Sequence, residues 1–386
     1  GGAAYLSIKL GAGHNKQAER IIGNVIYLLV VSSLVLTAIT LIFFKPILYF
    51  VGATDTLYPY AKAYTGILLI GMPFTLIGMG INSLIRADGS PKYAMISMLV
   101  GAFLNIVLDY IFIYPLNWGM EGAAWATIIG EMVAFLISVA YIPRFRCIKF
   151  RMRLLKYKAS VAKKIITFGI SNFIIQSAIT FVVIAYNNNL RYYGANSVYG
   201  SEIPLAAQGI ASKINQIFMS ILFGIGIGLQ PIVGFNCGAG LYKRVKQAFI
   251  YSVGIAFTFA CITFAILESY PEIFINMFGK ESDVLYNDFA NFTLRITISS
   301  AMFLSIQIVI TNFFRAMGKP WLATISALAK FTVFFIPAIY FLPKIWGLKG
   351  VLYVSPLTDF LAMVLAVSLL YFQMKRINRL IKVHKE

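Results

Sequence analysis

The hexapeptide Arg86-Ala87-Asp88-Gly89-Ser90-Pro91 returns as Arg315-Ala316-Met317-Gly318-Lys319-Pro320, 229 positions further along the chain. Two other short motifs repeat at nearly the same distance. Gly11-Ala12-Gly13 returns as Gly238-Ala239-Gly240, and Trp118-Gly119-Met120-Glu121-Gly122 returns as Trp346-Gly347-Leu348-Lys349-Gly350. Three repeats at almost one offset predict that about half of the chain is an internal duplication.

The repeated motifs lie among long apolar segments. Of the 386 residues, 59% are hydrophobic and 12% are charged, and the mean hydropathy is +0.80. Soluble domains do not have this composition. Runs of roughly 20 apolar residues, long enough to cross a bilayer, recur along the whole chain. We predict ten spans, at about 22–44, 60–84, 92–114, 122–142, 161–187, 205–235, 247–270, 289–313, 321–342 and 350–372. The predicted fold class is therefore an all-α polytopic membrane protein.

The duplication also predicts the domain organisation. Because an even number of spans separates the two copies, the repeats are parallel, as in transporters whose halves are related by an axis along the membrane normal. We expect two six-helix lobes, residues 1–150 and 151–386, with the binding site between or within them. Compared with the second repeat, the first lacks about one and a half helices at its amino terminus.

The net charge of +19 follows the predicted topology. Most of the 33 basic residues fall in alternate loops, and the carboxyl-terminal tail belongs to the same set. The positive-inside rule places this set in the cytoplasm, so we expect a multi-pass protein of a bacterial-type plasma (inner) membrane with a cytoplasmic carboxyl terminus. The basic segment 144–164 is expected to lie on anionic lipid headgroups. No nucleic-acid-reading module accompanies it, so we expect no nucleic-acid partner.

The cysteines and histidines do not indicate a metal or cofactor site. The three cysteines, Cys147, Cys237 and Cys261, have no metal-ligand spacing, and the two histidines, His14 and His384, lie in polar termini or loops. No disulfide framework is expected either. We find no P-loop and no Ser/His/Asp constellation that would indicate an enzyme.

Six charged residues fall inside the predicted spans, where each costs roughly 2.5–3.5 kcal/mol at a helix centre. They are Asp109, Glu131, Lys213, Arg295, Lys330 and Asp359. Glu131 and Asp359 are equivalent positions of the repeat, and we expect a structural or gating hydrogen bond at each, with substrate contact as the alternative. Lys330 is expected to snorkel or to pair, and Lys213 and Arg295 to reach the headgroups.

Asp109 is the main candidate for a coupling site. The predicted span that carries it runs outward, and the carboxyl group lies about 7–9 Å inside the outer end at 1.5 Å per residue. Asn105, four residues earlier, lies one turn deeper on the same helical face. Tyr64 and Thr127 reach a similar depth on neighbouring spans. A desolvated carboxylate in such a layer is neutralised by a proton or a cation, as a coupling site requires. The alternative is a hydrogen bond that only packs two helices together.

The chain resembles the multidrug and toxic compound extrusion (MATE) family of cation-coupled exporters. The motifs that carry the resemblance occur in the family's order over the whole chain. They are Gly11-Ala12-Gly13 with Ala18-Glu19-Arg20, residues 86–91, Leu104-Asn105-Ile106-Val107-Leu108-Asp109, residues 122–127, Gly228-Leu229-Gln230-Pro231 and Asn236-Cys237-Gly238-Ala239-Gly240. The resemblance implies two six-helix lobes with alternating access between them.

The resemblance also implies a set of site residues. In one branch of the family, an Asn and an Asp one turn apart on the fifth span bind the coupling cation within the amino-terminal lobe, and Asn105 and Asp109 match them. Tyr64, Asn82 and Thr127 fall where the supporting polar residues of that branch lie. A first-span Asp completes the site in that branch, and this sequence does not contain that span.

The function implied by the resemblance is secondary active multidrug efflux. The exporter would exchange protons, or sodium ions, for organic cations across the lipid bilayer, and we expect it to be a monomer. A second branch places sodium-binding acids in the seventh and tenth spans, where this chain has Gln176 and Gln307 but no acid. The alternative is a lipid-linked oligosaccharide flippase of the same superfamily. Such proteins need a strongly cationic central cavity, whereas the intramembrane cations here lie near the membrane faces.

Overall fold

The computed structural model describes residues 1–51, 58–145, 157–277 and 284–383, and within these ranges the chain is helical and contains no strand. The helices group into two units, Gly1–Ile166 and Thr167–Glu386. The prediction of an all-α fold is confirmed. The lobe boundary that we expected between residues 150 and 151 lies outside the described residues.

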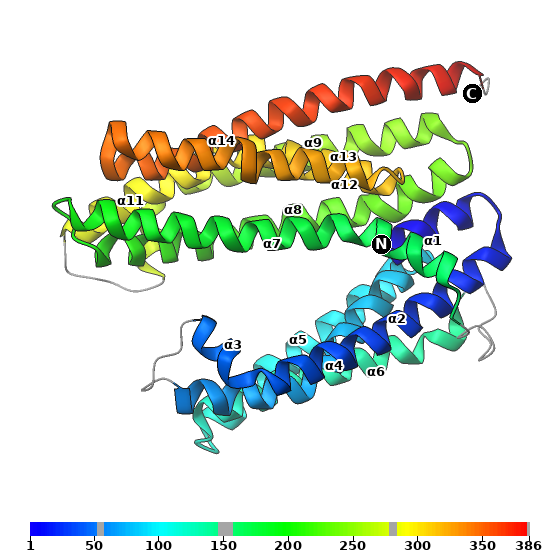
Figure 1. Ribbon diagram of the computed structural model, residues 1–386, viewed down its shortest axis with the longest axis horizontal. Helices are drawn as coiled ribbons and strands as arrows, with labels where there is room; N and C mark the ends of the chain where they lie inside the picture. Colours follow the sequence, from blue (N-terminus) through cyan, green and yellow to red (C-terminus); the bar gives the residue numbers. More distant parts are fainter. Residues whose placement is uncertain (52–57, 146–156, 278–283, 384–386) are drawn as a thin grey trace. The chain divides into compact units, whose positions relative to one another are not determined.

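The first unit consists of helices that run side by side (Figure 1). They are α1 (Gly2–Gly11), α2 (Asn15–Ile42), α3 (Phe44–Val51), α4 (Tyr58–Ala87), α5 (Pro91–Ile113) and α6 (Gly119–Ala140), followed by the 3₁₀ turn η1 (Ile142–Arg144). Both α4 and α5 pack along α6, and α2 packs along α4. The three helices α4, α5 and α6 therefore enclose the centre of this unit.

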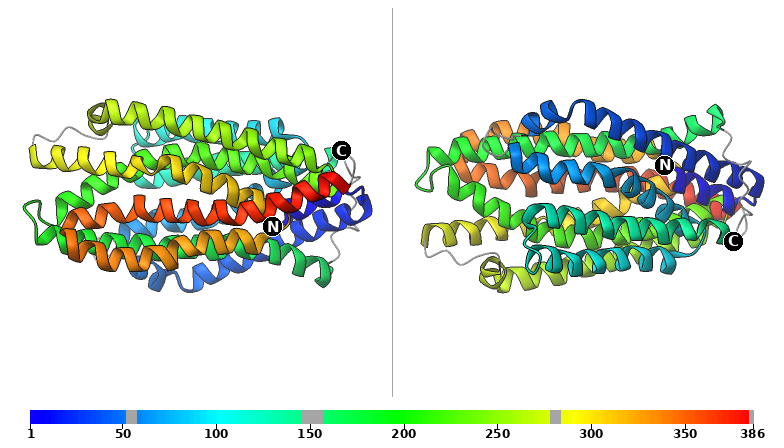
Figure 2. Two further views of the ribbon diagram at one scale, coloured as in Figure 1. Left: turned by 90° about the horizontal axis from the view of Figure 1, so that it is seen from above. Right: turned by 90° about the horizontal axis from the view of Figure 1, so that it is seen from below.

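The second unit contains the remaining helices (Figures 1 and 2). They are α7 (Ala159–Ala195, which begins in the first unit), α8 (Glu202–Gly238), α9 (Tyr242–Ser269), α10 (Pro271–Asn276), α11 (Val284–Ser299), α12 (Ala301–Ala316), α13 (Pro320–Leu328), the π-helical turn η3 (Ala329–Phe334) and α14 (Phe335–Val383). The α12 helix packs against α8, α9, α13 and α14. Its Val309, Phe313 and Phe314 are fully buried, so α12 forms the core of this unit.

The described helices account for the ten predicted spans. Eight segments are long and apolar enough to cross a membrane, and α11 with α12, bent by 40°, adds a ninth. One of the eight, Pro320–Lys382, would be about 95 Å long as one straight helix, three times the thickness of the bilayer core. It breaks at Gly347, where φ is 57° and ψ is −136°. The segment therefore forms two spans.

The three repeated motifs place a glycine at positive φ at the same point of each repeat. A left-handed backbone is open to glycine and strained for residues with a Cβ. The pairs are Gly13 and Gly240 (φ 70° and 78°), Gly89 and Gly318 (83° and 75°), and Gly119 and Gly347 (51° and 57°). The duplicated sequence thus encodes the same reversals of chain direction in both halves.

Glycines also bring α5 and α6 into close contact. A Cβ on Gly101 would lie 2.7 Å from the carbonyl oxygen of Gly130, and a Cβ on Gly130 would lie 2.6 Å from the carbonyl oxygen of Gly101. Small residues allow membrane helices to approach in this way. The contact sets the separation of α5 and α6, which carry Asn105, Asp109 and Thr127 of the predicted site.

Candidate functional site

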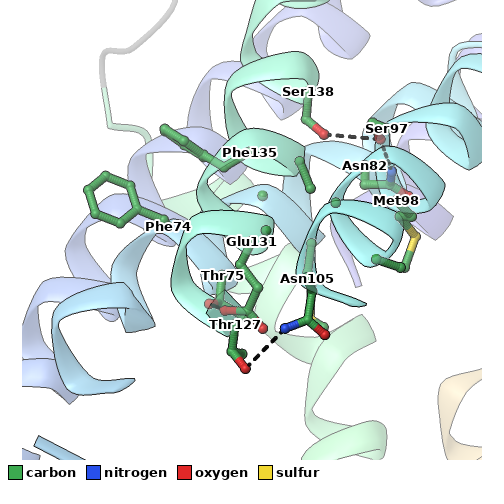
Figure 3. Close-up of a pocket in the computed structure, with 16 residues that line it drawn as sticks. Phe74, Thr75, Asn82, Ser97, Met98, Asn105, Thr127, Glu131, Phe135 and Ser138 are labelled. Carbon is green, nitrogen blue, oxygen red and sulfur yellow. Dashed lines mark hydrogen bonds between the residues drawn. The ribbon is translucent and has the colours of Figure 1, made fainter. Parts of the chain in front are cut away.

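A pocket of about 260 Å³ lies between α4, α5 and α6 in the first unit (Figure 3). All three helices contribute polar side chains to its lining, and apolar side chains of the same helices complete it. The polar side chains are Thr75, Asn82, Ser97, Asn105, Thr127, Glu131 and Ser138. The larger apolar ones are Phe74, Met79, Met98 and Phe135.

Asn105 and Thr127 meet across the α5–α6 interface. The Asn105 Nδ2 donates to Thr127 Oγ1 at 3.4 Å, and Thr127 Oγ1 donates to the carbonyl oxygen of Ala123 at 2.9 Å. Asn105 lies eight residues before the end of α5, and Thr127 lies eight residues after the start of α6. At 1.5 Å per residue, both are about 12 Å from the connecting loop, so they occupy one layer.

Asn82 lines the same pocket, but its amide is fully engaged by the protein. The side chain is buried, and its Nδ2 donates to the carbonyl oxygen of Ala94 at 2.7 Å and to Ser97 Oγ at 2.9 Å. Its Oδ1 accepts a hydrogen bond from Arg86. Because donors and acceptor are satisfied, Asn82 joins α4 to α5 and leaves no group free for a ligand in this conformation.

Asp109 and Tyr64 do not line this pocket. Asp109 lies one helical turn beyond Asn105 on α5, close to the end of the helix. Its Oδ1 is buried and has no hydrogen-bond partner among the described residues. Tyr64 is half-buried on α4, outside the pocket. The structure therefore brings Asn82, Asn105 and Thr127 together, with Asp109 one turn away and Tyr64 apart from them.

Glu131 contributes a carboxylate to the pocket. It lies one turn from Thr127 on α6, and it accepts a hydrogen bond from Thr75 Oγ1 of α4. In Figure 3 the carboxylate lies beside Thr75 and close to the Asn105–Thr127 pair. The sequence predicted a hydrogen bond or substrate contact for Glu131 but not its place in this site. The spacing could have indicated this place, because Thr127 and Glu131 are four positions apart and therefore share one helical face.

The chain matches a known family along most of its length. The family model described as MatE matches residues 1–111 and 170–341. The chain belongs to the MatE family. The resemblance seen in the sequence is thereby confirmed, and the many apolar helices of this MatE transporter make it a multi-pass membrane protein.

Similar proteins cover nearly all of this MatE chain. The multidrug export protein MepA of Staphylococcus aureus strain MSSA476 is 25% identical over 381 residues, which cover 98% of this chain and 82% of MepA. MepA of Staphylococcus haemolyticus strain JCSC1435 is 26% identical over 380 residues, covering 98% and 81%. A solved structure of the outward-facing conformation of a multidrug resistance MATE family transporter matches with a TM-score of 0.90 at 21% identity, covering 98% of this chain and 83% of that one.

The lining of the first-unit pocket has an acidic character in this MatE chain. Among the described residues that line it, Glu131 is the only charged one, and hydroxyl and amide groups surround it. Phenylalanine faces and methionine sulfurs are polarisable groups that accommodate organic cations. The pocket thus combines a carboxylate with an apolar wall, which suits a cation that carries hydrocarbon.

Three of the charged residues that we predicted inside the spans, Lys330, Asp359 and Arg295, form ion pairs in the second unit. Lys330 Nζ lies 2.5 Å from Asp359 Oδ1, and this pair is largely buried. Arg295 Nη1 lies 2.9 Å from Glu268 Oε1 in an exposed pair, and its expected reach to the headgroups stays a prediction. Lys330 therefore pairs rather than snorkels, and Asp359 has a partner of opposite charge.

Proposed function

We propose that this MatE transporter exports organic cations by secondary active transport, in exchange for protons or sodium ions. The observation that carries the proposal is the Oδ1 atom of Asp109, which is buried without a hydrogen-bond partner among the described residues. A carboxylate oxygen that is buried without a donor is costly unless a proton or a cation neutralises it. A carboxylate that is stabilised by a bound proton or cation is suited to bind a coupling ion and a cationic substrate in turn.

The names of the relatives support outward transport of drugs, and the charge of the first-unit pocket supports a cationic substrate. The two MepA proteins are named for multidrug export. In this chain the first-unit pocket offers the carboxylate of Glu131 next to aromatic and methionine side chains. A hydrophobic cation gains from both features, since the carboxylate provides charge and the wall provides apolar contact.

Each predicted site residue has a role in this proposal. Asp109 binds the proton or sodium ion, while Asn105 and Thr127 supply polar atoms one turn deeper. Asn82 positions α4 against α5, and Tyr64 is a supporting hydroxyl from α4. Apart from the coupling ion, no cofactor enters the cycle. We expect a monomer in the plasma membrane, with the carboxyl terminus in the cytoplasm.

The lipid-linked oligosaccharide flippase is the alternative. A pyrophosphate carries several negative charges, and its site needs arginines or lysines. No described residue that lines the first-unit pocket is basic, and Glu131 would repel a pyrophosphate. The charge of this pocket therefore favours the exporter.

The function is tested by transport in proteoliposomes. Purified protein is reconstituted, an inward proton gradient or an inward sodium gradient is imposed, and movement of ethidium is followed by fluorescence. We expect one of the two gradients to drive ethidium transport, which would also identify the coupling ion. Translocation of a fluorescent lipid-linked sugar without ethidium transport would contradict the proposal and support the flippase.

A further inference from the structure

The repeat relates the first-unit pocket to a second pocket in the other unit. This second pocket measures about 190 Å³ and is lined by residues of α7, α8, η3 and α14. At the repeat offsets of 228 and 229, Gly101, Thr127 and Glu131 correspond to Lys330, Ser355 and Asp359. The first three residues line the first-unit pocket, and the last three line the second-unit pocket. The two pockets therefore share these three positions of the duplicated fold, although α7 and α8 complete the second pocket where α4 completes the first.

The two pockets differ in how their carboxylates are neutralised. In the second unit, Lys330 Nζ lies 2.5 Å from Asp359, whose side chain is only 5% exposed. In the first unit the position of Lys330 is taken by Gly101, and a side chain there would collide with Gly130 of α6. The second unit thus contains its own tethered cation, whereas Glu131 of the first unit accepts a hydrogen bond from the hydroxyl of Thr75 and has no cationic partner in the part of the chain that the structure describes.

Among the described residues that line the second-unit pocket, Lys330 is the only basic one, and the others near Asp359 are neutral polar or apolar groups. The Oε1 atom of Gln208 is buried without a hydrogen-bond partner, although its residue lines the pocket. Ser355 and Thr358 contribute hydroxyls from α14. An ammonium group placed between Asp359 and Gln208 would satisfy this acceptor, and Lys330 alone leaves it unsatisfied.

Lys330 lies on a backbone segment of unusual geometry. The turn Ala329–Phe334 is π-helical between α13 and α14. Such wide turns interrupt the regular ladder of helical hydrogen bonds and are frequent at functional sites. The lysine side chain is flexible, and at 18% exposure it is less enclosed than Asp359. Lys330 is therefore the more exposed partner of the pair.

We propose that Asp359 is a second substrate-binding carboxylate of the transporter and that Lys330 is its built-in competitor. The ammonium group of a small alkylamine displaces the Lys330 ammonium from Asp359 and donates a hydrogen bond to Gln208. When the substrate leaves, Lys330 returns to Asp359, so the carboxylate is neutralised without a coupling ion. This inference rests on the proposed function only in that the ligand is a transported organic cation.

Tethering determines the strength of this competition. A group held next to its partner by a short flexible chain competes at an effective concentration in the millimolar range or above. The substrate therefore binds weakly while Lys330 is present, and it is released readily. Removing the lysine ammonium should convert Asp359 into a site of higher affinity.

The test uses Lys330→Met and n-butylammonium, which reproduces the end of a lysine side chain. Binding to purified protein in detergent is measured by isothermal titration calorimetry. We expect Lys330→Met to bind n-butylammonium at least about tenfold more tightly than the wild type, because the tethered competitor is gone. The gain should disappear in the double variant Lys330→Met, Asp359→Asn. The matched control is Lys213→Met, which removes an exposed lysine of α8 in the same unit and should leave the affinity unchanged.

Two results would overturn the inference. If the affinity of Lys330→Met stays at the wild-type value, or if the gain persists without the Asp359 carboxylate, the ion pair only joins η3 to α14. A second measurement needs no change at Lys330: at saturation, the wild type should bind one more n-butylammonium than Asp359→Asn, and equal numbers would contradict the proposal. Ethidium transport is a separate readout, so failure of this inference is distinguishable from failure of the exporter function.

Discussion

Replacing Gly101 by alanine tests whether the α5–α6 contact maintains the first-unit pocket. The added Cβ would lie 2.7 Å from the carbonyl oxygen of Gly130 and 2.8 Å from the Cβ of Ala134. Ordinary contacts of a Cβ begin at 3.4 Å, so the helices must separate by about 0.7 Å, and overpacking of this kind costs roughly 1–3 kcal/mol. The Asn105–Thr127 hydrogen bond, already 3.4 Å long, would be lost.

The matched control is Gly254→Ala on α9, where a new Cβ meets no atom within 4 Å. Both substitutions gain about 1 kcal/mol of helix propensity, so their difference isolates the steric cost. We measure the free energy of unfolding by SDS titration in mixed micelles, and the affinity for ethidium in the folded state. Gly101→Ala should be about 1–3 kcal/mol less stable than Gly254→Ala and should bind ethidium more weakly. Equal stability of the two variants would refute the close packing of α5 and α6.

Two further substitutions address the first-unit pocket, and a third addresses the pH dependence of stability in the second unit. Glu131→Gln removes a charge from the pocket. Because a hydrogen bond to a charged group is worth roughly 1.5–3 kcal/mol, we expect the affinity for ethidium to fall about tenfold or more. An unchanged dissociation constant would exclude Glu131 from substrate binding. Asn82→Ala removes bonds to Ala94 and Ser97 and should lower the unfolding free energy by about 1–3 kcal/mol, which SDS titration measures; unaltered stability would contradict its role as a support. Burial and the charge of Arg376 hold the pKa of Lys319 below its usual 10.5. Between the lowered pKa of the folded protein and 10.5, the unfolded chain therefore binds more protons than the folded one. The free energy of unfolding should rise with pH in this range. Lys319→Gln should remove this rise, which SDS titrations at several pH values measure. An unfolding free energy that rises equally steeply with pH in the variant and the wild type would contradict the prediction.

The fold was largely predictable because its signals are local. Each apolar run is long enough to show a span, and the repeated motifs show where the chain reverses direction. The glycines at positive φ explain why those motifs repeat, since Gly119 and Gly347 occupy the same left-handed turn in each half. The break at Gly347 was visible in the sequence as the end of one predicted span and the start of the next.

The site was predictable only in part, because its contacts join different helices. The spacing along α5 and α6 placed Asn105 and Thr127 at one depth, and the structure has them hydrogen-bonded. The spacing of residues along one helix does not reveal which side chain of a neighbouring helix each of them contacts. The bond from Thr75 to Glu131 and the bonds from Asn82 to Ala94 and Ser97 depend on the rotation of α4 against its neighbours.

The pairing of Lys330 with Asp359 illustrates the same limit. The two residues are 29 positions apart, and this separation does not indicate a contact. The contact depends on the π-helical turn and on the return of α14 after Gly347. The equivalence of Glu131 and Asp359 was visible from the repeat offset. The different partners of the two carboxylates, a threonine hydroxyl and a lysine ammonium, appear only in the packed helices.

The central claim is that the carboxylate of Asp109, whose Oδ1 atom is buried, couples an ion gradient to export. The most direct measurement compares ethidium transport by wild type and Asp109→Asn in proteoliposomes, under the gradient that drives the wild type. We expect the variant to insert and fold like the wild type and to lose gradient-driven transport, because the amide cannot exchange a proton or neutralise a cation. Transport by Asp109→Asn at the wild-type rate, with the same dependence on the gradient, would contradict the account.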